Sequence, residues 1–153
     1  MPIQPLPEGA QPLIPYLIVN KAAAAIEFYK LVFAADEVLR MAGPDGKSIM
    51  HAELRIAGCL IYLADENPEQ GHLSPTTVGT TTVGLSLYCL DADKVFNRAL
   101  DHGAEVVRPM MDAFWGDRYG VVVDPFGHQW SLMTRKEHLS PEEMVQRGNQ
   151  SMR

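Results

Sequence analysis

The side chains best suited to chemistry in this sequence are a histidine and a glutamate two residues apart, His51 and Glu53. If they lie on a strand, alternation directs both side chains to the same face. An imidazole beside a carboxylate can serve as a base with its orienting partner, or can supply two metal ligands. The alternative is a polar pair at the rim of a sheet that bonds only to its neighbours.

The elements that must position these side chains occur twice in the chain. The segment 17–40, LIVNKAAAAIEFYKLVFAADEVLR, is answered by LYCLDADKVFNRALDHGAEVVR over residues 87–108. Each copy continues into a strand-like stretch that opens with a glycine, Gly58 or Gly127. Such a repeat predicts two similar supersecondary units with a cleft between them. We expect an α+β fold of two tandem β-α-β-β-β units, in residues 12–66 and 81–136, that form a cupped mixed sheet.

Hydrophobic periodicity places the elements of the first unit. Residues 15–19 form a short strand, and Asn20 is the expected N-cap of a helix over residues 21–35. The helix buries the face made by Ala22, Ala25, Ile26, Tyr29 and Phe33. In the strand 49–56, Met50, Ala52, Leu54 and Ile56 are expected on one side, and His51, Glu53 and Arg55 on the other.

The second unit repeats this order after a polar linker at 65–80. We expect strands at 83–90, 105–110, 119–123 and 129–134, with a helix over 92–102 that Asp91 caps. Trp130 alternates with Ser131 and should face the core. Residues 1–138 are then one domain. Ser140, Pro141 and the acids after them begin a C-terminal helix and tail over 139–153.

Composition and charge limit the kinds of partner that we expect for this protein. The formal charge of −6 argues against nucleic acid, which requires a surplus of Lys and Arg on one face. No apolar stretch is long enough to cross a bilayer, and we expect no membrane contact and a cytoplasmic location. Cys59 and Cys89 lie in apolar strand-like runs and are expected to be buried, without a disulfide.

The order FWG, RYG and DPFG over residues 114–127, with AIEFYKLVF and IMHAELRIAG upstream, resembles the vicinal oxygen chelate superfamily and its PhnB-like branch. That superfamily includes glyoxalase I, extradiol dioxygenases and the fosfomycin and bleomycin resistance proteins. The resemblance implies the doubled fold above and a homodimer. It does not imply one reaction, because one fold hosts many chemistries.

In metal-dependent members of that superfamily each unit supplies two ligands, which the resemblance places at Ile14, Tyr62, Leu85 and Ser131. Divalent metals of this class require oxygen or nitrogen donors, and two of these four side chains are hydrocarbons. The inherited metal site is therefore expected to be absent, and glyoxalase I activity is not expected. We predict no cofactor. A divalent metal stays an alternative, because His51 and Glu53 can supply two ligands to one.

The same resemblance directs Tyr62, Trp115 and Tyr119 toward the cleft, where flat rings can stack on a planar ligand or hold a cation. Packing of the core or of a lid is the alternative for Trp115. Ser131 and Gln129 complete the expected ligand-binding set. The sequence thus favours a metal-free small-molecule-binding protein, for instance one that sequesters an antibiotic or metabolite. The alternative is a lyase, isomerase or dioxygenase with a reorganised site around His51 and Glu53.

Overall fold

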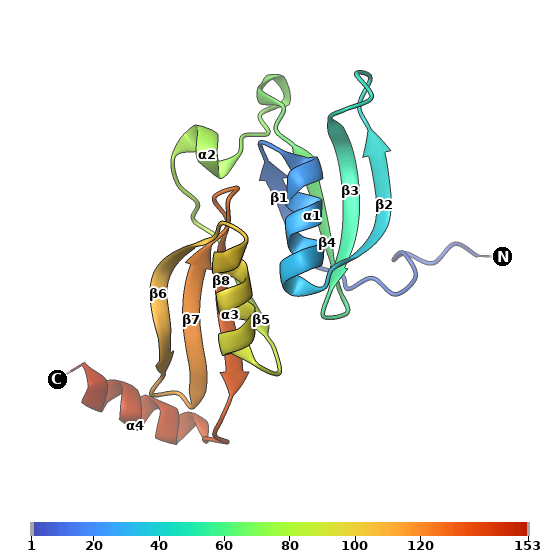
Figure 1. Ribbon diagram of the computed structural model, residues 1–153. Coiled ribbons are helices and arrows are strands. Elements are labelled where there is room, and N and C mark those ends of the chain that lie inside the picture. Colours follow the sequence, from blue (N-terminus) through green and yellow to red (C-terminus); the bar gives the residue numbers. More distant parts are fainter. Residues whose placement is uncertain (1, 153) are drawn as a thin grey trace. The chain divides into compact units, whose positions relative to one another are not determined.

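In the computed structural model, which describes residues 2–152, the chain divides into two compact units with their boundary between Thr80 and Thr81 (Figure 1). Each unit carries a four-stranded mixed sheet with one helix against it. The predicted fold class of two tandem β-α-β-β-β units is confirmed.

The first unit has the sheet order β1-β4-β3-β2. Its elements are β1 (Tyr16–Val19), α1 (Ala22–Phe33), β2 (Asp36–Ala42), β3 (Ile49–Ile56) and β4 (Cys59–Asp65), followed by the short helices η1 (Pro68–Gln70) and α2 (Pro75–Val78). Strand β1 runs parallel to β4, and the other pairs are antiparallel. The five residues predicted for the inner face of α1 are all buried, so this helix and the sheet share one core.

The start of α1 differs from the prediction. Its N-cap is Lys21 rather than Asn20, and no side chain of the cap residue bonds to the helix. Instead Asp65, at the end of β4, accepts a hydrogen bond from the backbone N–H of Ala22 at 2.8 Å. The helix ends at Phe33, because the next residue has a left-handed backbone (φ 54°). A cap that comes from another strand cannot be recognised from local sequence.

Met50 is a second correction, since its side chain is 55% exposed and does not join Ala52 in the core. The register between β2 and β3 is irregular between Met41 and Ala42, so that Ala42 pairs with Ile49. Ile49, 4% exposed, occupies the buried position at the start of β3. From His51 onward the predicted alternation is regular.

The second unit repeats the topology with the order β5-β8-β7-β6. Its elements are β5 (Gly84–Tyr88), α3 (Ala92–Asp101), β6 (Glu105–Asp112), β7 (Asp117–Val123), β8 (Gln129–Arg135) and α4 (Pro141–Ser151). Asp91 caps α3 as predicted, accepting from the backbone N–H of Lys94 at 3.1 Å. Ser140 and Glu143 form the predicted capping box of α4.

The DPFG turn has a structural role. Asp124 is 4% exposed, and one carboxylate oxygen accepts from the backbone N–H groups of Phe126 and His128. Its other oxygen accepts from the indole N–H of Trp130 at 2.9 Å. Trp130, 2% exposed, is in the core as predicted. The DPFG motif therefore has a structural role and not a chemical one. It fixes the shape of the turn and holds the turn to Trp130 in the core.

The two cysteines differ from the prediction and from each other. Cys59 is exposed although its register partner Ile56 is buried, because it is the first residue of β4 and lies at the end of the strand pair, next to the Ala57-Gly58 turn. Cys89 is half-buried, and burial raises the pKa of its thiol.

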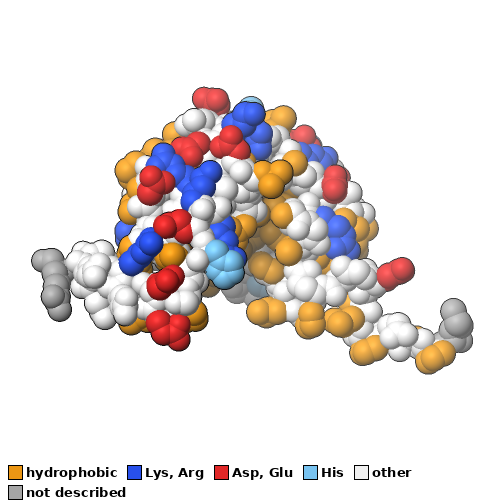
Figure 2. Space-filling view, turned by 90° about the horizontal axis from the view of Figure 1, so that it is seen from below, with side chains coloured by type: hydrophobic (Ala, Val, Ile, Leu, Met, Phe, Trp, Pro, Cys, Tyr) orange, Lys and Arg blue, Asp and Glu red, His pale blue; other side chains and the backbone are white. Residues whose placement is uncertain are grey.

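The distribution of charge and the lengths of the helices concern binding to nucleic acid and to membranes. Lys and Arg side chains lie intermixed with Asp and Glu on the face in Figure 2, which shows no extended basic patch. None of the helices in residues 2–152 is long and apolar enough to span a membrane.

Candidate functional site

A group of polar and aromatic side chains lies on the face of the first sheet opposite α1. His51 and Glu53 extend from β3 to this face, as predicted, because Ala52 between them is fully buried on the other side. Tyr16 and Tyr62 share the face, since the register pairs Tyr16 with Tyr62 and Tyr62 with Glu53. We call Tyr16, His51, Glu53 and Tyr62 the tyrosine–histidine cluster.

Hydrogen bonds join three members of this cluster in a row. The Tyr16 hydroxyl lies 3.0 Å from Nδ1 of His51, and Nε2 of His51 lies 3.2 Å from Oε1 of Glu53. With the imidazole neutral, Nε2–H donates to the carboxylate and Nδ1 accepts from the phenol. With the imidazole protonated, Nδ1–H donates to the Tyr16 oxygen, and the hydroxyl proton becomes available to a ligand. The Tyr16 hydroxyl, at the outer end of this row, can therefore offer a ligand either a hydrogen-bond acceptor or a hydrogen-bond donor.

Aromatic contacts surround the imidazole. Its centroid is 4.8 Å from that of Tyr62 and 5.6 Å from that of Tyr16, and the two tyrosine rings meet edge to face at 5.8 Å. The side chains of His51 and Glu53 are 22% and 23% exposed, while Tyr16 is 44% exposed. Burial raises the pKa of Tyr16, so the hydroxyl stays protonated at neutral pH.

Tyr16 was not predicted as a site residue. It lies in a short strand whose apolar neighbours suggested only core packing. The usable signal was alternation: Leu17 and Val19 are buried, which directs Tyr16 and Ile18 to the opposite face. Its partnership with His51 depends on a strand pairing that spans 35 residues.

A cavity of about 640 Å³ adjoins Tyr16 in the first unit. Its lining comes from the β2–β3 hairpin and from the segment that follows β4, and includes Met50, Glu66, Glu69 and His72. Hydrogen bonds from Ser74 and Thr77 hold the Glu66 carboxylate and lower its pKa. The volume is within the range of small-molecule sites.

The matching face of the second sheet carries the other predicted binding residues. Ser131 and Gln129 lie on one face of β8, with Val121 and Val123 beside them on β7. Trp115 and Tyr119 meet edge to face with centroids 4.9 Å apart. The structure thus brings Tyr62 together with His51 and Glu53, and Trp115 together with Tyr119. The binding or catalytic role of all seven residues stays a prediction.

Leu85 is a correction among the predicted metal-ligand positions. It pairs with Trp130, so its side chain is on the face that α3 covers. Ser86 pairs with Ser131 and occupies the open face instead. The one-residue error arose from the register of a short strand, in which a slip exchanges the two faces.

The donor set does not fit a divalent metal even after this correction. Ile14 is a hydrocarbon, and Tyr62 and Ser131 are hydroxyls. The open-face neighbours of Leu85 are Gly84, which has no side chain, and Ser86, so none of these positions supplies the carboxylates and imidazoles that such ions favour. Within residues 2–152 no three His, Cys, Asp or Glu side chains are grouped closely enough to hold a metal ion.

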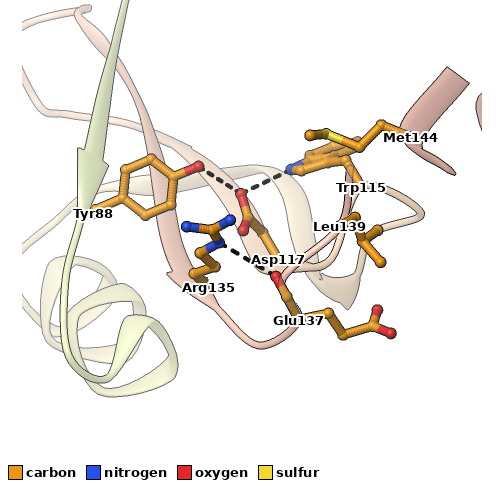
Figure 3. Close-up of a pocket in the computed structure, with 7 residues that line it drawn as sticks. All are labelled: Tyr88, Trp115, Asp117, Arg135, Glu137, Leu139 and Met144. Carbon is orange, nitrogen blue, oxygen red and sulfur yellow. Dashed lines mark hydrogen bonds between the residues drawn. The ribbon is translucent and has the colours of Figure 1, made fainter. Parts of the chain in front are cut away.

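A second polar group lies at the end of the second sheet (Figure 3). Asp117, 4% exposed, accepts hydrogen bonds on Oδ2 from the hydroxyl of Tyr88 at 2.8 Å and from the indole N–H of Trp115 at 2.9 Å. These side chains line a cavity of about 380 Å³ together with Arg135, Glu137, Leu139 and Met144. Trp115 is therefore fixed by a buried carboxylate at a cavity wall.

Comparison with known proteins assigns a class to this fold. The family model described as Glyoxalase/Bleomycin resistance protein/Dioxygenase superfamily matches residues 12–132. The chain belongs to this superfamily, as the sequence predicted. An uncharacterized protein of Mycobacterium bovis is 50% identical over 123 residues, which cover 78% of this chain and 80% of the relative.

Solved structures of other proteins share the fold. TioX from Micromonospora sp. ML1 superposes with a TM-score of 0.64 at 25% identity, covering 82% of this chain and 99% of TioX. The PhnB protein from Bacillus cereus shares the fold with a TM-score of 0.65 at 18% identity, over 81% and 99% of the two chains. The fosfomycin resistance protein FosX from Listeria monocytogenes, complexed with Mn(II), shares it with a TM-score of 0.64 at 18% identity, over 88% and 97%.

Proposed function

We propose that this protein captures a small organic molecule at the tyrosine–histidine cluster and does so without a bound metal. The observation that carries the proposal is the packing of three rings, those of Tyr16, His51 and Tyr62, around a hydrogen-bonded row on one sheet face. Rings in edge contact present flat surfaces to a planar ligand. The hydrogen-bonded row that ends at Glu53 supplies polar groups that fix the orientation of the ligand. Sequestration of an antibiotic or a metabolite is the biological role that we infer.

The metal-free part of the proposal rests on donor chemistry. A superfamily relative such as FosX has been solved with Mn(II), whereas the matching positions here offer no carboxylate or imidazole. We expect protein purified without added metal or chelator to contain no stoichiometric transition metal by elemental analysis. A full equivalent of metal that is lost in His51→Ala would contradict this part of the proposal.

The binding part is tested by a thermal-shift screen with glycopeptide antibiotics and planar aromatic metabolites. We expect at least one compound to raise the melting temperature, and Tyr62→Ala to weaken its binding about tenfold through loss of a stacking surface. Glu27→Gln, on the exposed side of α1, is the matched control and should bind normally. Failure of every compound to stabilise the protein, or equal affinity of Tyr62→Ala, would contradict the assignment of the site.

A second candidate function is supported by the hydrogen-bonded row itself. Tyr16, His51 and Glu53 form a path along which a proton can move, as a lyase or isomerase requires. A dioxygenase, by contrast, would need the metal ligands that these positions lack. Incubation of a bound compound followed by mass spectrometry separates the two functions. Chemical conversion that His51→Gln abolishes, with binding retained, would favour the enzyme.

A further inference from the structure

The cavity of the second unit contains a buried carboxylate whose second oxygen is available to a ligand. Both protein donors, Tyr88 and Trp115, bond to Oδ2 of Asp117. Oδ1 accepts no hydrogen bond from the described residues. No fully buried side-chain polar atom in the described chain lacks a partner, so Oδ1 is not fully buried, and Asp117 lines the cavity. Figure 3 shows this carboxylate between Tyr88 and Trp115.

This carboxylate has no cationic partner. None of the ion pairs among residues 2–152 includes Asp117, although the residue is only 4% exposed. A buried carboxylate held by neutral donors alone leaves much of its charge uncompensated. A positively charged group that entered the cavity would therefore be bound strongly at Oδ1.

A complementary cation is located on the neighbouring strand. Arg135 is the register partner of Asp117, and its Nε donates to the backbone oxygen of Glu137 at 3.3 Å. Its two terminal nitrogens have no hydrogen-bond partner among the described residues. Glu137 does not neutralise them, because its carboxylate is held by Arg147 at 2.8 and 3.2 Å. On neighbouring strands, the cavity thus presents one carboxylate oxygen and two guanidinium nitrogens that have no hydrogen-bond partner among the described residues.

The remaining walls are aromatic and apolar. Trp115 and Tyr88 contribute rings, and Leu139 and Met144 contribute aliphatic surface from the segment and helix beyond β8. These last two residues lie outside the superfamily match, which ends at residue 132. The segment after residue 132 therefore supplies part of the cavity wall, whereas Tyr88, Trp115 and Asp117 lie within the match. Its volume, about 380 Å³, is at the small end of ligand sites.

We propose that this cavity binds a free α-amino acid with an apolar or aromatic side chain. The ammonium group meets Oδ1 of Asp117, and the carboxylate meets the terminal nitrogens of Arg135. The side chain of the ligand lies against Trp115, Leu139 and Met144. This site is in the second unit, so the inference does not depend on the function proposed for the tyrosine–histidine cluster.

The test uses the full chain and isothermal titration calorimetry with L-phenylalanine. Two analogues each lack one charge: phenethylamine has no carboxylate, and 3-phenylpropionate has no amine. We expect L-phenylalanine to bind and each analogue to bind at least about tenfold more weakly, because phenethylamine leaves the guanidinium of Arg135 without a partner and 3-phenylpropionate leaves the buried carboxylate of Asp117 without one. Equal binding of phenethylamine would show a simple cation site and would overturn the amino-acid assignment.

Variants of the cavity residues test whether L-phenylalanine binds in this cavity. Asp117→Asn retains an acceptor for Tyr88 and Trp115 but removes the charge, and Arg135→Gln removes the cation. Each should lose about tenfold or more in affinity. Met144→Trp fills the cavity from α4 without altering Asp117, and it should abolish binding even if Asp117→Asn fails to fold. Arg55→Gln, in the first unit, is the charge-matched control. Absence of heat with L-phenylalanine, or normal binding by Met144→Trp, would overturn the proposal.

Discussion

Asp117 illustrates how one side chain determines the state of its neighbours. The carboxylate accepts from the Tyr88 hydroxyl, and this hydrogen bond is the main reason why the pKa of Tyr88 lies above its ordinary value of 10.0. Ionisation of the phenol would place two negative charges together and would lose the hydrogen bond. Tyr88 therefore remains a donor throughout the neutral range.

The residue-scale prediction is that Asp117→Asn lowers the pKa of Tyr88 toward 10.0. Ultraviolet titration of phenolate absorbance measures this, with Tyr88→Phe identifying the contribution of the residue. Because the pKa in the folded protein is the higher one, the stabilisation is complete below the unfolded pKa. It is lost as the pH rises through the folded pKa. Because Asp117→Asn keeps an acceptor for Tyr88 and removes only the charge, an unchanged titration in this variant would show that the charge of the carboxylate is not the cause.

The sequence predicted part of the candidate site for identifiable reasons. His51 and Glu53 could be paired because a separation of two residues on a regular strand fixes a shared face. Tyr16 could not be added, since its contact with His51 arises from pairing among β1, β4 and β3. Leu85 was misplaced because nothing in a five-residue strand specified its register. Long-range pairing limited the prediction more than residue chemistry did.

At the scale of elements, each sheet holds the start of its own helix by the same device. Asp65 at the end of β4 accepts from the first N–H of α1, and Thr134 near the end of β8 accepts from the Ala92 N–H of α3 at 2.8 Å. Asp65 also accepts from the backbone N–H of Ile49 at 2.7 Å, and so fixes the start of β3. These two residues couple helix and sheet at corresponding places of the repeat.

We predict that Asp65→Ala lowers the free energy of unfolding by about 2–3 kcal/mol, because two partly buried backbone donors lose their acceptor. Thr134→Val, the matched change in the second unit, leaves the Ala92 N–H without its acceptor and the Cys89 carbonyl without its donor. Because the lost group is a neutral hydroxyl and not a charged carboxylate, the change should cost less, about 1–2 kcal/mol. Urea-induced unfolding followed by circular dichroism measures both. A larger loss in Thr134→Val than in Asp65→Ala would contradict this account of the caps.

At the scale of the whole molecule, one edge strand of each sheet, β2 in the first and β6 in the second, has exposed apolar side chains. Every residue of β2 is exposed, and its apolar side chains include Val38 and Leu39. Strand β6 likewise exposes Val106, Val107 and Met111. Apolar edge strands of this length invite pairing with another chain. Superfamily proteins often dimerise, and we infer that a second copy covers part of this surface.

The prediction at this scale is a homodimer, with a molar mass twice the 17.0 kDa of one chain. Light scattering coupled to size-exclusion chromatography measures it across a range of concentrations. Leu39→Lys and Val107→Lys, which place charges on the two edge strands, provide the comparison, and we expect at least one to shift the population toward monomer. A mass of one chain at all concentrations would refute the inference.

The unequal exposure of the two cysteines has a practical consequence. The thiolate is the form that reacts with maleimides, and burial disfavours this form at Cys89, whereas Cys59 is exposed on the β3–β4 turn. A brief reaction near neutral pH should therefore attach one fluorophore or spin label to the first unit of the natural sequence. Mass spectrometry would verify the single adduct. A second cysteine introduced after Thr80 would then report the distance between the two units in solution.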